Sequence, residues 1–271
     1  MIITPHPYGR MANRLALATH WICHVEKYGG TYLHLAFADY ARFFTNTRRS
    51  HVIRYRSSKG DVAGWKPRRL VGVDSILFTI DRHGGDYPLS SPVFLEKERT
   101  TRFLFTLGWN FRDFPAIAEF SDFARRYFEP VQKHDDAANF FVDQCRRNSD
   151  VLVGVHIRQT DYAKFMGGKW LYPLAEYRRC MEAVAGFTPG RTRFVVASDA
   201  PVDDVAFRGL DVVPAPGHAY QDNLVLSRCD LLIGPPSTYN QWASFYGKVP
   251  AFRIAEAGMS VRREDFKVMG I

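Results

Sequence analysis

The sequence lacks several features that would point to other classes of protein. No apolar run approaches the roughly 20 residues needed to cross a bilayer. The chain begins Met-Ile-Ile-Thr-Pro, without the basic segment and apolar stretch of a secretory signal, so we expect a cytoplasmic protein. There are no repeats and no C-x-x-C pair, which argues against a zinc site. We expect the four scattered cysteines to be buried free thiols.

Positive charge is concentrated in one stretch of the chain. The net charge is +8, and Arg42–Arg69 holds seven Arg and two Lys against Asp61 alone, which accounts for the whole excess. This stretch is either a solvated basic loop or a patch for anionic partners such as an acidic glycan or a lipid headgroup. The sequence shows no nucleic-acid-binding module, so we expect no specific nucleic acid partner. With such a patch, the protein would contact the inner membrane surface peripherally.

Short apolar runs alternate with helical patterns over much of the chain. The runs at 151–157, 192–197, 211–213, 230–233 and 249–254 are predicted strands, with helices between them. A strand at 2–3, a helix at 13–28 and a strand at 32–35 open the N-terminal part, and 71–73 and 76–80 are further strand candidates. The pattern predicts an α/β protein with parallel sheets. We place the boundary between two Rossmann-like domains at 149/150.

Ligands bind beyond the carboxyl ends of strands in such sheets, which directs attention to the loop after 151–157. His156 and Arg158 alternate along the strand end and are expected to project to the same face. The forked guanidinium of Arg158 suits a diphosphate, and Asp161 is placed to orient it. A simple ion pair at the strand end explains the same residues.

Two later loops carry further candidates. Ser198 and Asp199 follow the strand 192–197 and would either contact a ribose or cap a helix. Ser237 and Thr238 begin a predicted helix, where free N–H groups and the helix dipole favour phosphate. Asp222 is placed to cap the helix before them or to face a nucleotide.

The loop between the first strand and the first helix carries the N-terminal candidates. Gly9 allows a ligand to approach closely, and Arg10 is long enough to reach a phosphate or the transferred sugar. The loop has no complete G-x-G-x-x-G, so it predicts no dinucleotide fingerprint and is also consistent with a structural turn.

Taken in order, these segments resemble the fucosyltransferase superfamily that carries an H-x-R-R-x-D motif. The similar segments are GRMANR (9–14), HIRQTDY (156–162), FVVASD (194–199) and DNLVLSRCDLLIGPPSTYNQW (222–242). The resemblance is greatest to bacterial α1,2-fucosyltransferases, and it extends to α1,6- and protein O-fucosyltransferases. It implies a GT-B fold with two Rossmann-like domains facing a central cleft, and inverting transfer from GDP-fucose to a glycan or glycolipid without metal or other cofactor.

The resemblance also implies roles, and the chain departs from the family pattern at three positions. Arg158 would stabilise the leaving diphosphate, helped by His156, Ser237 and Thr238. Asp199 and Asp222 would bind the nucleoside. The sugar and phosphates of the donor would contact Gly9, Arg10 and Asn13. Gln159 replaces the second arginine of the motif, and Ala12 and Arg14 replace the usual Gly and Gln.

Several alternatives stay open at this stage. The general base is Asp161, Asp39 or Glu26. Another donor, such as GDP-mannose, or a UDP-sugar, would suit the same fold. A non-catalytic glycan- or nucleotide-binding protein is a further alternative.

Overall fold

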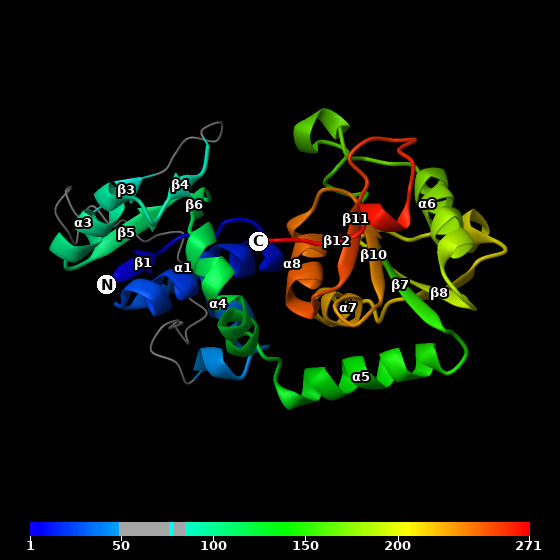
Figure 1. Ribbon diagram of the computed structural model, residues 1–271, viewed down its shortest axis with the longest axis horizontal. Coiled ribbons are helices and arrows are strands. Elements are labelled where there is room, and N and C mark those ends of the chain that lie inside the picture. Colours follow the sequence, from blue (N-terminus) through cyan, green and yellow to red (C-terminus); the bar gives the residue numbers. More distant parts are fainter. Residues whose placement is uncertain (49–75, 79–84) are drawn as a thin grey trace. The chain divides into compact units, whose positions relative to one another are not determined.

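The protein is described by a computed structural model over residues 1–48, 76–78 and 85–271. It forms two compact units, Met1–Val131 and Gln132–Ile271 (Figure 1). The sequence places the division later, at 149/150. The difference is helix α5 (Gln132–Arg146), which packs on helix α7 (Ala219–Leu226) and strand β7 (Val151–Ile157) of the second unit. Most of Arg42–Arg69 and the strand candidate 71–73 lie outside the described residues.

The second unit is built on a six-stranded sheet of order β12-β11-β10-β7-β8-β9. Besides β7 its strands are β8 (Thr192–Ser198), β9 (Asp211–Pro214), β10 (Leu231–Gly234), β11 (Pro250–Arg253) and β12 (Lys267–Val268). All neighbouring pairs are parallel except β11 with β12. Helices cover the central strands on both faces, so both faces of these strands need apolar side chains. The valine-rich runs meet this requirement. The alternation in the sequence therefore predicted the five parallel strands of this sheet, whereas the antiparallel edge strand β12 was not predicted.

Helices α6 (Leu174–Phe187), α7 and α8 (Thr238–Gly247) cover this sheet, with a short 3₁₀ turn, η7 (Asp204–Phe207), before β9. Gly154 in β7 allows the close approach of α7. A Cβ at this position would lie 2.6 Å from side-chain carbons of both Leu226 and Leu232. A larger residue here would force the Leu226 and Leu232 side chains to move.

The first unit contains a parallel four-stranded sheet of order β2-β1-β5-β3. Its strands are β1 (Ile2–Thr4), β2 (Tyr32–His34), β3 (Ile76–Phe78) and β5 (Leu104–Leu107), and β4 (Tyr87–Pro88) pairs with β6 (Phe111–Arg112). The helices are α1 (Met11–Tyr28), α2 (Ala38–Ala41), α3 (Pro92–Thr100) and α4 (Phe114–Tyr127). β1, α1 and β2 match the prediction, whereas β4, β5, β6 and α3 were not predicted.

A buried histidine joins three helices of the first unit. His24 of α1 contacts the Asp113 carboxylate through Nδ1 at 2.6 Å and the Glu98 carboxylate of α3 through Nε2 at 2.8 Å. Asp113 also caps α4 by accepting from the Ala116 N–H. Burial lowers the pKa of His24, but its hydrogen bonds to Asp113 and Glu98 outweigh this and raise it above its ordinary value. The result is a buried imidazolium between two carboxylates.

All four cysteines are buried and free, as expected. Burial raises the pKa of Cys23 and of Cys180 to about 12. Both thiols are therefore neutral near pH 7 and unreactive, because the thiolate is the nucleophile. In the described parts of the chain, no helix is long and apolar enough to span a membrane.

Candidate functional site

Three polar loops of the second unit leave the same edge of its sheet. Because β7 lies between β8 and β10 and runs parallel to both, the carboxyl ends of the three strands are adjacent. Ile157 of β7 pairs with Ser198 of β8. The segments after β7, β8 and β10, far apart in sequence, therefore meet at one place.

Arg158 lies at the centre of this edge, held by two carboxylates. Its Nε and one terminal nitrogen donate to the two oxygens of Asp161, both at 2.7 Å, and Nε lies 3.2 Å from Asp199. Only 16% of the Arg158 side chain is exposed. Burial acts to lower the pKa of Arg158, but the hydrogen bond to Asp161 and the charge of Asp199 raise it. The guanidinium is thus a permanent, oriented cation.

Asp199 organises the loop that carries Arg158. Its carboxylate accepts from the Gln159 N–H at 2.7 Å and from the Thr160 hydroxyl. Burial acts to raise the pKa of Asp199, but the hydrogen bonds from Thr160 and Gln159 and the charge of Arg158 lower it. These contacts give the residue a positioning role that its place after β8 did not suggest.

Gln159, at the position of the family's second arginine, braces the same loop. Its Nε2 donates to the Tyr172 carbonyl at 2.9 Å, which ties the start of the loop to the segment before α6. The positive charge at the strand end comes from Arg158.

His156 is buried beneath the loop. Its ring packs against Tyr239, with centroids 4.7 Å apart, and its Nδ1 has no hydrogen-bond partner among the described residues. Burial, reinforced by the charge of Arg158, lowers the pKa of His156 to about 3. The imidazole is therefore neutral near pH 7, so only one of its two nitrogens carries a hydrogen to donate.

The His156 pKa predicts a loss of stability in acid. Because the unfolded chain takes up a proton near pH 6.5 and the folded chain does not, the free energy of unfolding falls as the pH drops below 6.5. Between pH 7 and pH 5 this histidine contributes a loss of about 2 kcal/mol. Denaturant titrations of wild type and His156→Gln at both pH values measure the effect. An identical pH dependence in the variant would contradict the assignment.

Tyr162 contacts both Arg158 and the segment that leads into α8. The Tyr162 hydroxyl donates to the Pro236 carbonyl at 2.6 Å, and its ring lies under the Arg158 guanidinium at 5.8 Å. Ser237 caps α8 by accepting from the Tyr239 N–H at 3.2 Å. The N-terminus of α8, including Thr238, therefore opens at the same edge as Arg158.

A cavity of about 440 Å³ lies beyond β8 and β9. Its apolar lining includes Val196, Ala197, Phe207, Leu210, Val212 and Pro214, and its polar lining includes Ser198, Arg208 and Asp222. Asp222 accepts from the Gly217 N–H at 2.8 Å and from the His218 N–H, and burial raises its pKa. This cavity was not predicted from the sequence because η7 and β9 supply mainly apolar walls, which carry no polar motif.

The N-terminal candidates lie together in the first unit. Gly9 has φ +64°, and a Cβ there would lie 1.9 Å from the Asn13 amide nitrogen, so the position requires glycine. Arg10 is exposed at the start of α1. Arg14, a departure from the family pattern, pairs with Asp39 at 2.8 Å.

Two candidates for the general base, Glu26 and Asp39, differ in their distance from the start of α1. Glu26 lies about 24 Å along α1 from Arg10, at 1.5 Å per residue, whereas Asp39 contacts the first turns of the helix through Arg14. In the described residues, no group of three or more His, Cys, Asp or Glu side chains is arranged to hold a metal ion.

Comparison with known proteins places this fold among fucosyltransferases. No family model and no curated protein matches the sequence. Arabidopsis thaliana FUT1, a mutant in complex with GDP, aligns over 98% of this chain and 73% of its own, with a TM-score of 0.63 and 11% identity. NodZ α1,6-fucosyltransferase soaked with GDP-fucose aligns over 95% and 97%, with a TM-score of 0.59 and 14% identity.

A third similar structure is POFUT1 in complex with GDP-fucose. It aligns over 96% of both chains, with a TM-score of 0.55 and 13% identity. These similarities cover nearly the whole chain, and the protein has the GT-B type of α/β fold with Rossmann-like units, as predicted. At such low identity the similarity shows the fold alone.

Proposed function

We propose that this protein is an inverting, metal-independent glycosyltransferase that transfers fucose from GDP-fucose to a hydroxyl of a glycan or glycolipid. The observation that carries the proposal is the oriented guanidinium of Arg158 at the carboxyl edge of the second sheet, beside the start of α8. The fold is that of proteins solved with GDP and GDP-fucose. We further propose a cytoplasmic location.

The diphosphate of the donor would contact Arg158 and the N-terminus of α8. Nε and one terminal nitrogen of the guanidinium donate to Asp161, which orients the group, so the other terminal nitrogen would donate to the diphosphate. Ser237 and Thr238 add donors at the helix start. Neutral His156 supplies one more hydrogen bond from beneath the loop.

The nucleoside would occupy the cavity beyond β8 and β9. The apolar walls suit the faces of a purine, and Ser198 and Asp222 provide polar groups at its edge. Asp199 is assigned to positioning Arg158, since its oxygens already bind the loop. Gly9, Arg10 and Asn13 of the first unit would contact the donor sugar and phosphates.

In the reaction, the bond between the sugar carbon and the β-phosphate oxygen breaks, and the acceptor hydroxyl attacks from the opposite face. Negative charge grows on the departing diphosphate, where Arg158 is already oriented to receive it. The acceptor proton passes to a carboxylate. Asp39 and Asp161 are the candidates for this base, and each is ion-paired in the structure.

Calorimetric titration in EDTA tests the donor assignment. We expect GDP and GDP-fucose to bind without metal, and UDP to bind at least about tenfold more weakly, because a pyrimidine fills less of the cavity. The same titration with GDP-mannose tests whether this sugar nucleotide is the donor in place of GDP-fucose. Equal affinity for UDP, or no binding of any nucleotide, would contradict the proposal.

A further inference from the structure

The loop between β7 and α6 presents an apolar tip to solvent. Phe165 is 50% exposed, Met166 62% and Leu171 38%. These three side chains lie within seven consecutive residues of the sequence. Other exposed large apolar side chains described in this unit, such as Phe140 and Val205, are isolated.

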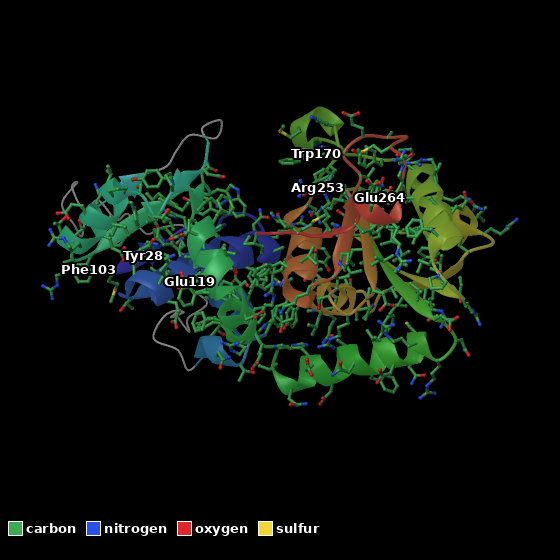
Figure 2. The ribbon with its side chains drawn as sticks, viewed as in Figure 1. Tyr28, Phe103, Glu119, Trp170, Arg253 and Glu264 are labelled. Atoms are coloured by element: carbon green, nitrogen blue, oxygen red, sulfur yellow. The ribbon has the colours of Figure 1, made fainter. Side chains whose placement is uncertain are left out.

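Aromatic packing holds this tip together. The Tyr162 and Phe165 rings stack with centroids 5.6 Å apart, and the Trp170 ring lies 5.7 Å from Phe165. Trp170 lies beyond the carboxyl edge of the sheet, above Arg253 at the end of β11 (Figure 2). The apolar tip is therefore supported from within and directed away from the sheet.

The backbone at the tip is held in an unfavourable conformation. Met166 has φ +51°, followed by Gly167 at +67° and Gly168 at +82°. The left-handed region costs a non-glycine residue such as Met166 free energy. Burial of the Met166 side chain in the protein does not offset this cost, because the side chain faces solvent.

The charged side chains within residues 163–171 have one sign. Lys164 and Lys169 are exposed, and the Lys169 ammonium lies 5.9 Å from the Trp170 ring centre. No acidic residue occurs from 162 to 175, and Asp161 before this range is paired with Arg158. Apolar side chains flanked by lysines match a surface with an apolar interior and anionic headgroups.

We propose that the loop 163–171 docks the protein on an anionic lipid bilayer. Phe165, Met166 and Leu171 would enter the boundary between headgroups and acyl chains, with Trp170 at headgroup depth. Lys164 and Lys169 would contact anionic headgroups. The proposal is independent of the donor assignment, although the same connection between β7 and α6 carries Arg158.

Vesicle co-sedimentation at low ionic strength tests this proposal. We expect the intact protein to sediment with vesicles of phosphatidylcholine and phosphatidylglycerol, and at least about tenfold less with phosphatidylcholine alone. The double variant Phe165→Ser/Met166→Asn should lower the affinity at least about tenfold. Asparagine at 166 tolerates the left-handed conformation. Lys164→Ala/Lys169→Ala should reduce the preference for anionic vesicles.

Phe140→Ser on α5 is the matched control, because it removes an even more exposed ring from another surface. It should sediment as wild type does. Unchanged melting temperatures would show that all variants are folded. Failure of wild type to sediment with anionic vesicles, or wild-type sedimentation of the Phe165/Met166 variant, would overturn the proposal.

Discussion

Replacing Arg158 with alanine should lower the rate of fucosyl transfer by about 100-fold or more. The guanidinium is held by Asp161 and Asp199 before substrate binds, so it stabilises the leaving diphosphate without reorganisation. Loss of one such charge-assisted donor costs about 3 kcal/mol in the transition state. Turnover of GDP-fucose measures the loss in rate, and calorimetric titration with GDP measures the change in nucleotide affinity separately.

Two variants make this result specific. Arg158→Lys keeps the charge but loses the paired contacts to Asp161, so we expect most of the activity to be lost here too. Arg146→Ala removes another arginine of the second unit, which donates to both oxygens of Asp230 at 2.9 Å. That control should transfer fucose at the wild-type rate. Wild-type turnover in Arg158→Ala would remove the basis of the proposed mechanism.

Replacing His24 with leucine should destabilise the first unit by about 3–5 kcal/mol, since the buried Asp113 and the partly buried Glu98 carboxylate would lose the cation between them. Denaturant unfolding measures the loss. His6→Leu, at a half-buried position of the same unit, serves as the control and should change stability little. Wild-type stability in His24→Leu would show that the imidazolium is not required.

The pH dependence of the His24 effect has a defined sign. The folded pKa is raised, so the stability that its charge contributes is fully present below the unfolded value of about 6.5. It is lost as the pH rises through the folded pKa. Wild type should therefore lose part of its stability advantage over His24→Leu at alkaline pH.

Local patterns in the sequence were sufficient for the second sheet and for part of its site. The runs 151–157 and 192–197 are strands because consecutive β-branched and apolar residues suit a sheet covered on both faces. The pairing of Arg158 with Asp161 spans three residues and follows from the loop itself. In the first unit, β5 was missed because Leu104–Leu107 is a short apolar run without clear alternation, which periodicity alone does not assign to a strand.

The sequence by itself determined the five parallel strands of the second sheet and which charged groups stand at their ends, because these depend on neighbours along the chain. Tertiary structure decided what those groups contact. Asp199 binds the loop at Gln159 because β8 lies next to β7, and α5 belongs to the second unit because its buried face meets α7. Such contacts join residues tens of positions apart, so they depend on strand order and helix packing, which no local pattern encodes.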